Sequence, residues 1–232
     1  MARRVYKRKD VFFPMSTVIK ADLNQHPDIW ASDVVSVVSE GGVIGYPTET
    51  IYGIGGDATS ERVVQRVNGL KKRDVRHPML VLVGRKSEIY RLAQRISDKA
   101  ELLMDRLWPG PLTLVFDALP VLPKGVLSEE GRIGVRISSD PVCQALLKIL
   151  GKPLISTSAN PHGKKPARSA AEVQGYFGTS LDMIIDGGER LGRVPSTVLD
   201  VSTDPPRLVR KGAVKTTDII KWIGEIHENA SV

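Results

Sequence analysis

The sequence predicts an α/β fold, and three observations favour this class. Short apolar segments typical of strands alternate with segments whose apolar residues recur at helical spacing. The 232 residues are 41% hydrophobic and 25% charged, which suits one large domain with a sizeable core. No apolar run approaches the roughly 20 residues that a membrane-spanning helix needs. We therefore expect a protein that has no membrane partner.

Charge and cysteine content bound the partners and the compartment. The net charge of +7 and the pI near 9.5 predict an anionic partner such as a nucleotide or RNA. Basic residues crowd positions 3–9, which form either a solvated tail or a nucleic-acid contact. The single cysteine, Cys143, excludes an internal disulfide and a cysteine-based metal cluster. Together with the absence of an apolar secretory core near the N-terminus, it favours a cytoplasmic location.

We expect three parts along the chain. Residues 1–24 show neither a helical nor a strand period and are expected to form a basic extension that drapes over the domain. Residues 25–227 are expected to form one domain, and residues 228–232 a short tail. Either Met1 or Met15 is the start of the chain.

The first helix and strand lead to a polar loop. Trp30, Val34 and Val38 recur at helical spacing, and Gly41 is placed to end that helix. Residues 40–57, EGGVIGYPTETIYGIGGD, then combine a short apolar strand with a glycine-flanked loop. Polar groups that follow an apolar strand are either part of a tight turn or ligand-binding groups, and the segment alone leaves both open.

A basic segment follows the second expected helix. Ser60 is placed to cap this helix, whose buried side is predicted to include Val63, Val67 and Leu70. Residues 71–78, KKRDVRHP, come next. They are either cations favoured by the helix dipole or a phosphate clamp.

The middle of the chain predicts two amphipathic helices and two strands. The helices are expected near residues 87–94 and 97–107. Residues 112–116 and 132–137 read as strands separated by a surface loop. Arg132 and Arg136 lie on one face of the second strand, so they need anionic company from protein carboxylates or from a ligand.

The last third alternates again between helices and strands. A helix is expected to begin at Asp140-Pro141 and to end at Gly151, with Cys143 as a buried structural thiol. Strands near residues 153–155, 181–185 and 197–200 are next to hydroxyl or acidic residues. The hydroxyls of residues 156–158 are either turn caps or ligand contacts. An amphipathic helix beginning near Thr216 follows.

Hydroxyl groups at three strand ends and basic residues in three stretches favour a site for a polyphosphate and a small polar molecule. The sequence contains no GxxxxGK[ST], GxGxxG, HExxH or GxSxG motif. A P-loop, a dinucleotide fold, a zincin site and a hydrolase triad are therefore not supported. No metal-ligating set of residues is predicted.

Eight segments resemble the YrdC-like family in its order. They are GGVIGYPTETIYGIGGDA, LKKR with HPMLVLV, LWPGPLTLVF, IGVRIS, PLISTSANPHG, MIIDGG, PSTVLDV and LVRKGA, spread over about residues 30–225. The resemblance implies a twisted, mixed parallel and antiparallel sheet flanked by helices, around a deep basic groove. Within the family, the chain is most similar to the short, single-domain proteins.

The implied reaction joins L-threonine, bicarbonate and ATP into threonylcarbamoyl-adenylate and pyrophosphate. This product serves the threonylcarbamoyladenosine modification of tRNA, so the implied partners include the tRNA-modification proteins that use the adenylate. ATP would be a substrate, with Mg²⁺ as cofactor.

The resemblance also implies roles for individual residues. Lys71 and Arg73 match a KxR pair and would be catalytic. The implied nucleotide-binding residues are Lys71, Arg73, His77, Arg132, Ser158, Asn160 and Arg210. The implied threonine-binding residues are Thr48, Thr50, Arg136, Ser156 and Ser196.

The chain departs from the family pattern at Leu82, where many members carry a histidine near threonine. Two other functions stay open. One is a double-stranded RNA-binding or RNA-maturation module, although only 5% of the residues are aromatic. The other is a carbamoyl-transfer relative, although such proteins usually carry additional domains.

Overall fold

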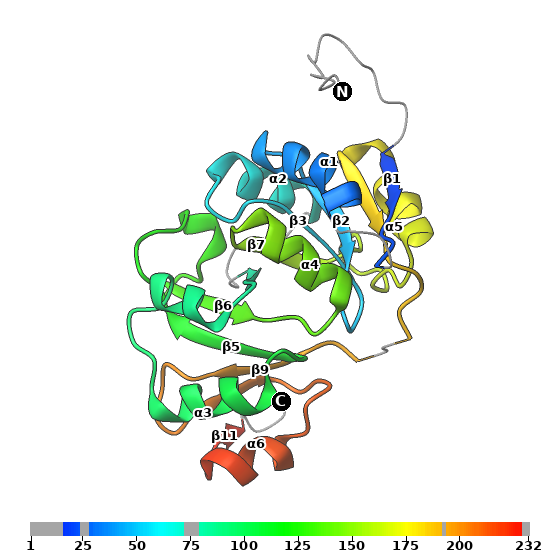
Figure 1. The fold of residues 1–232 in the computed structure, drawn as a ribbon. Coiled ribbons are helices and arrows are strands. Elements are labelled where there is room, and N and C mark those ends of the chain that lie inside the picture. Colours follow the sequence, from blue (N-terminus) through cyan, green and yellow to red (C-terminus); the bar gives the residue numbers. More distant parts are fainter. Residues whose placement is uncertain (1–15, 24–27, 72–78, 192–193, 229–232) are drawn as a thin grey trace.

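The computed structural model describes residues 16–23, 28–71, 79–191 and 194–228, which form one mixed sheet with helices on both faces (Figure 1). The described strands are β1 (Thr17–Lys20), β2 (Ile44–Pro47), β3 (Tyr52–Gly55), β4 (Leu80–Leu82), β5 (Leu112–Asp117), β6 (Arg132–Arg136), β7 (Leu154–Ser158), β8 (Met183–Asp186), β9 (Thr197–Asp200), β10 (Arg207–Arg210) and β11 (His227–Glu228). The described helices are α1 (Asp28–Ser39), α2 (Glu61–Lys71), α3 (Asp98–Leu107), α4 (Pro141–Leu150), α5 (Ala170–Phe177) and α6 (Thr216–Ile223).

The strand order within the described residues is β1-β8-β2-β3-β7-β4-β6-β5-β9-β10-β11. Parallel pairs such as β4 with β6 occur beside antiparallel pairs such as β5 with β6. The expected mixed α/β sheet flanked by helices is therefore confirmed. No helix in the described part of the chain is long and apolar enough to span a membrane.

Two apolar clusters hold the helices to the sheet. On one face, α1 and α4 pack Trp30, Val34 and Leu146 against residues such as Tyr46 of β2. On the other face, α2, α3, α5 and α6 contribute to a larger cluster with residues such as Phe116 of β5. The helices of the first face cover only part of it, because their apolar cluster reaches from β8 to β4 and does not include β6, β5 or β9 (Figure 1).

Several helix ends are fixed as the sequence predicts. The Asp140 side chain accepts a hydrogen bond from the Cys143 backbone N–H, and Pro141 occupies the first turn of α4. Gly151 ends that helix with a φ of +60°, which favours glycine. Gly41, with a φ of +80°, follows α1 in the same way.

Two local expectations differ from the structure. Residues 17–20 form strand β1 at the edge of the sheet, parallel to β8, so the expectation of no strand before residue 24 is wrong. The residues of β1 are mostly exposed and do not alternate clearly between apolar and polar, so the sequence gives no strand signal. Backbone pairing with β8 holds this segment in place. Near residues 87–94 the helix is a 3-10 turn, Lys86–Arg91, in which only Ile89 is buried. The boundaries 1–24, 25–227 and 228–232 stay a prediction.

Cys143 offers a direct test of the packing under α4. It is buried, and burial raises the pKa of its thiol to about 12, with nearby Asp140 acting in the same direction. The reactive thiolate is therefore rare near neutral pH. We expect Ellman's reagent to modify essentially no thiol in the native protein and one thiol per chain in guanidinium chloride. Rapid reaction of the native protein would contradict this packing.

Candidate active site

A cavity of about 480 Å³ opens over the sheet face that α1 and α4 leave uncovered. Successive side chains of a strand point to opposite faces of the sheet. Those on the face opposite the larger apolar cluster point into the cavity and form its floor. Thr113 of β5, Arg136 of β6 and Ser156 of β7 do so, while their neighbours Leu114, Val135 and Ile155 belong to the core.

The turn between β2 and β3 gives the cavity two threonine hydroxyls. Thr48 Oγ1 donates to the Ile51 carbonyl oxygen at 2.6 Å and lies 3.1 Å from Thr50 Oγ1. A hydroxyl has one hydrogen, so Thr50 is the donor in the bond between the two threonines. The oxygen of Thr50 keeps acceptor capacity toward the cavity, which suits an ammonium or hydroxyl donor of a ligand.

Lys71, in the last turn of α2, lies almost buried against the end of β7. Its ammonium group donates to the carbonyl oxygens of Ser158 and Asn160, at 2.6 and 2.5 Å, and contacts the Asn160 side-chain oxygen at 3.1 Å. The Asn160 amide nitrogen in turn donates to Pro161 and Lys164 carbonyl oxygens. Lys71 therefore ties the loop after β7 to the cavity and carries a positive charge there.

Arg210 and Ser196 form the opposite wall. Arg210 Nη2 donates to the Ser196 carbonyl oxygen at 2.8 Å and to Ser196 Oγ at 3.1 Å. Ser196 Oγ also lies 3.0 Å from Thr113 Oγ1. A side chain at Gly212 would come within 2.3 Å of the backbone beside Ser196, so glycine permits this close approach.

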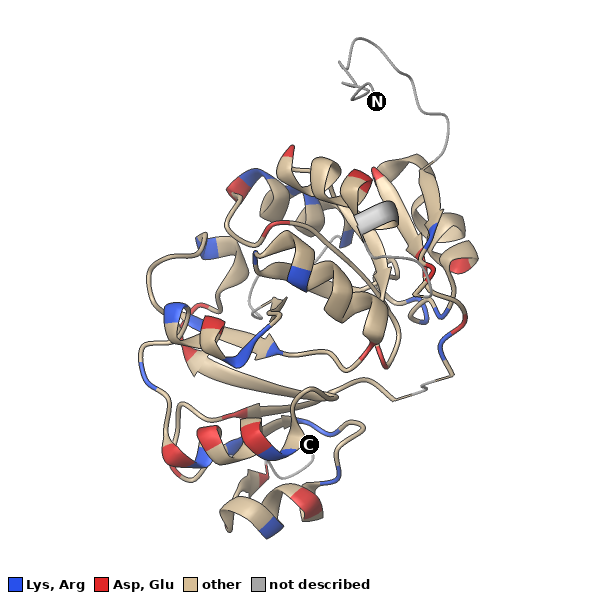
Figure 2. Cartoon of the chain, in the orientation of Figure 1, with Lys and Arg blue, Asp and Glu red and all other residues tan. Residues whose placement is uncertain are grey.

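Positive charge accumulates in this wall. Burial lowers the pKa of Arg210, and the charge of Arg136 lowers it further, so the two guanidinium groups repel each other. None of the described residues that line the cavity carries a carboxylate. Elsewhere both signs are interspersed, for example along α3 (Figure 2). The cavity is thus suited to an anion, because an anion would relieve the repulsion between the two arginines.

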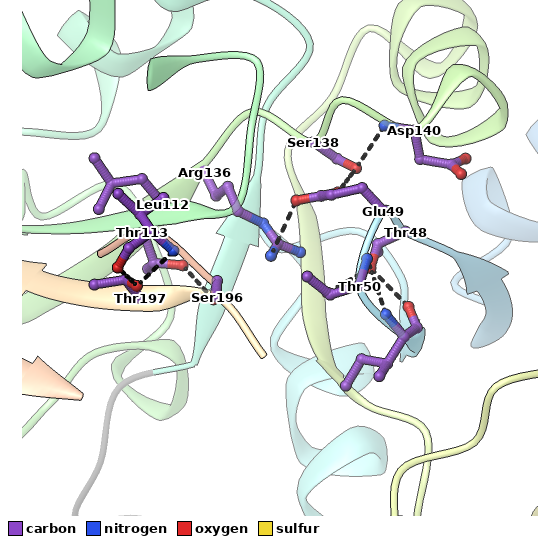
Figure 3. Close-up of polar contacts among 12 residues, drawn as sticks. Thr48, Glu49, Thr50, Leu112, Thr113, Arg136, Ser138, Asp140, Ser196 and Thr197 are labelled. Carbon is purple, nitrogen blue, oxygen red and sulfur yellow. Dashed lines mark hydrogen bonds and ion pairs between the residues drawn. The ribbon is translucent and has the colours of Figure 1, made fainter. Parts of the chain in front are cut away.

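Arg136 has one carboxylate beside it, at the rear of the cavity. Its Nη1 lies 3.4 Å from Glu49 Oε1, and Glu49 Oε2 accepts a hydrogen bond from Ser138 Oγ (Figure 3). Glu49 itself does not line the cavity.

The structure brings most of the predicted site residues to one place. Those that line the cavity are Thr48, Thr50, Lys71, Arg136, Ser156, Ser158, Asn160, Ser196 and Arg210. Arg73 and His77 lie outside the described residues. The roles assigned to all these residues stay predictions, and so does the deep basic groove.

Arg132 is not part of the cavity lining. It shares a strand face with Arg136 but lies at the other end of β6, where Nη1 is 2.8 Å from buried Asp200 and Nε is 3.5 Å from Asp117. The anionic company that the sequence analysis required for Arg132 is therefore protein carboxylate.

Sequence reasoning missed Thr113 and His162, which also line the cavity. Thr113 is a polar residue within the apolar segment LTLVF, and its alternation with Leu112 and Leu114 was the available signal. His162 is exposed on the loop after β7 and carries no comparable signal.

Leu82 is fully buried among Val142, Leu146 and other residues under α1 and α4, and it does not line the cavity. The position where many YrdC-like proteins carry a histidine is therefore part of the apolar core here.

The described residues do not fit a protein-held metal. They contain no group of three or more His, Cys, Asp or Glu side chains placed to hold an ion. Mg²⁺ typically uses carboxylates together with substrate phosphates, and the described lining offers no carboxylate.

The motifs that form the cavity match a known family. A family model described as "Telomere recombination", of the Sua5/YciO/YrdC type, matches residues 36–212. The chain belongs to this family. The match includes every predicted site residue, from Thr48 to Arg210.

Two relatives in the family are named threonylcarbamoyl-AMP synthase. The protein from Pyrococcus abyssi is 35% identical over 84% of this chain and 57% of its own length. The protein from Klebsiella pneumoniae is 35% identical over 82% of this chain and 99% of its own length. The chain thus spans little more than half of the first relative and nearly all of the second.

A solved structure of the family supports the fold. The P. abyssi Sua5 protein complexed with L-threonine matches with a TM-score of 0.88 and 32% identity, over 92% of this chain and 63% of that one.

The contribution of the hydrogen bond between Thr113 and Ser196 can be tested by measuring the stability of variants. Thr113→Val keeps the shape of the side chain and removes its hydrogen bond, leaving buried Ser196 with one partner fewer. We expect the free energy of unfolding in urea to fall by about 1 kcal/mol. Thr113→Ser keeps the hydroxyl and should retain more of the stability. A loss in Thr113→Ser as large as that in Thr113→Val would contradict the importance of the hydroxyl pair, because only Thr113→Val removes the hydrogen bond.

Proposed function

We propose that this chain is a threonylcarbamoyl-AMP synthase that makes threonylcarbamoyl-adenylate and pyrophosphate from L-threonine, bicarbonate and ATP. The observation that carries the proposal is a single cavity that combines hydroxyl groups with the cations Lys71, Arg136 and Arg210. Relatives of both lengths bear this enzyme's name. The product would serve tRNA modification through a partner protein that transfers the group.

The proposed amino-acid end of the cavity contains Thr50, Arg136 and Ser196. The guanidinium of Arg136 suits the carboxylate of threonine, because a fork of N–H donors matches two carboxylate oxygens. The acceptor capacity of Thr50 Oγ1 suits the amine or the hydroxyl of threonine. A substrate that lacked the hydroxyl would leave buried polar groups unpaired, which is the physical basis of selectivity.

The proposed nucleotide end contains Lys71, Ser158, Asn160 and Arg210. Lys71 fixes the position of Ser158 and Asn160 while its charge faces the same space. Arg210 is already oriented by Ser196, so little side-chain conformational freedom remains to be lost on binding. Arg73 and His77 would join this end if the resemblance holds at those positions.

The reaction brings two anions together. The amine of threonine and bicarbonate form a carbamate with loss of water, and a carbamate oxygen then attacks the α-phosphorus of ATP. A P–O bond forms, the P–O bond to the β-phosphate breaks, and pyrophosphate leaves with the electron pair. The cations of the cavity offset the repulsion between carbamate and phosphate, and a desolvated site strengthens this effect. Mg²⁺ is expected only with the phosphates of ATP.

The first test is substrate dependence of pyrophosphate release. We expect release from the wild-type protein only when L-threonine, bicarbonate and ATP are all present. The product should appear as threonylcarbamoyl-adenylate by mass spectrometry. Release that is indifferent to threonine would overturn the proposal, and activity with carbamoyl phosphate in place of threonine and bicarbonate would favour a carbamoyl-transfer enzyme.

The second test removes the charge of Lys71. Lys71→Met keeps the aliphatic volume but loses the ammonium group that holds the loop and faces the phosphates. We expect kcat/KM for ATP to fall by about 10² to 10³-fold. Lys148→Met is a matched control, because Lys148 is also in the last turn of a helix but is exposed. An unchanged kcat/KM in Lys71→Met would exclude a direct role for this charge.

A further inference from the structure

Glu49 is placed behind the cavity rather than in it. Its chain neighbours Thr48 and Thr50 line the cavity, but the Glu49 side chain extends toward Arg136 and Ser138 (Figure 3). The side chain is only 14% exposed. A nearly buried carboxylate is costly unless its oxygens are paired; here Oε2 accepts a hydrogen bond, whereas Oε1 is buried and has only the ion pair with Arg136 among the described residues.

The two oxygens of Glu49 have separate partners. Oε1 lies 3.4 Å from Arg136 Nη1, and Oε2 accepts the hydroxyl hydrogen of Ser138. Ser138 Oγ in turn accepts a hydrogen bond from the Asp140 backbone N–H at 3.2 Å. Since Asp140 caps α4, the carboxylate of Glu49 is tied to the beginning of that helix. Its position is thus set by contacts within the protein.

Arg136 is incompletely paired in the described part of the chain. Its side chain is only 4% exposed, and its buried Nε has no hydrogen-bond partner among the described residues. The contact with Glu49 is longer than a strong charged hydrogen bond and involves one edge of the guanidinium group. The terminal Nη groups, rather than the buried Nε, are the donors that we assign to an anion in the cavity that Arg136 lines.

We propose that Glu49 is a positioning residue, which holds one edge of the Arg136 guanidinium group so that the other donors bind the carboxylate of the amino-acid substrate. This inference rests on the proposed function. Without Glu49, the long side chain of Arg136 would lose its fixed orientation. Repulsion from Arg210 would then push the Arg136 guanidinium group away from the carboxylate of the substrate. Glu49 thus acts through Arg136 and has no contact with the reacting atoms.

The test is the Michaelis constant for each substrate in Glu49→Ala and Glu49→Gln. We expect Glu49→Ala to raise the KM for L-threonine about tenfold or more, with the KM for ATP changed less than about twofold. Glu49→Gln keeps a side-chain oxygen at the same distance and should restore most of the threonine affinity. An unchanged or lowered KM for threonine in Glu49→Ala would overturn the proposal, as would equal changes for both substrates.

Two further variants separate positioning from loss of folding. Asp182→Asn is the matched control, because it weakens another partly buried Arg–carboxylate pair, with Arg66, away from the cavity. It should leave both KM values unchanged. Ser138→Ala frees one oxygen of Glu49 and should raise the KM for threonine in the same direction by a smaller factor. A normal KM in Ser138→Ala would contradict the link through Ser138.

Wild-type protein is assayed first, so that failure of the two proposals can be distinguished. If it shows no threonine-dependent release of pyrophosphate, the proposed function fails, and calorimetric titration with L-threonine then decides about Glu49. Weaker binding to Glu49→Ala than to the wild type would support the positioning role. Equal binding, or no binding to either protein, would overturn it.

Discussion

The architecture of the cavity depends on keeping cationic side chains where water is scarce. Lys71 and Arg136 are buried, and a buried ammonium or guanidinium group is costly without oxygen partners, so both require a nearby acceptor, whereas Arg210 is more exposed. Lys71 uses the carbonyl oxygens that end β7, Arg210 uses Ser196, and Arg136 uses Glu49. The partners of Lys71 and Arg210 are uncharged oxygens, so these contacts leave both positive charges in the cavity lining. Burial lowers the pKa of Arg210, and the charge of Arg136 lowers it further, so these two cations are close enough to repel each other.

The fold meets this requirement through uneven covering of one sheet face. The helices α1 and α4 bury apolar side chains of β2, β4 and β7, but the same face over β5, β6 and β9 is open. Strand alternation then decides which residues enter the cavity, because the opposite side chains are needed by the core. Arg136, Arg210 and the hydroxyls come from strands, strand ends and the turn between two strands, whereas Lys71 comes from the last turn of α2. Because these elements are rigid, little conformational entropy of the protein is lost when a ligand binds.

Local patterns in the sequence predicted much of this arrangement, and long-range contacts account for the rest. Helical spacing, the Asp140 cap and the glycine at 151 are local signals, and the structure agrees with them. Hydroxyl groups at three strand ends suggested a shared site, but the assignment of Thr48, Ser156 and Ser196 to it came through resemblance to a family, because no local rule brings them together. The contact between Glu49 and Ser138 joins residues 89 positions apart and has no sequence signal. Strand β1 was missed for a similar reason, since its order comes from pairing with β8.

Leu82 shows why position in a motif and position in space must be considered separately. The motif places it where many family members carry a histidine near threonine, but its side chain packs in the apolar cluster under α4. A neutral imidazole there would need hydrogen-bond partners within that cluster, whereas leucine needs none. Under the proposed function, recognition of the threonine hydroxyl is then expected from groups that do face the cavity. Thr50 is the best placed of these. The hydroxyl hydrogen of Thr48 is donated to Ile51, and that of Thr50 is donated to Thr48. The hydroxyl oxygen of Thr50 is therefore left as an acceptor.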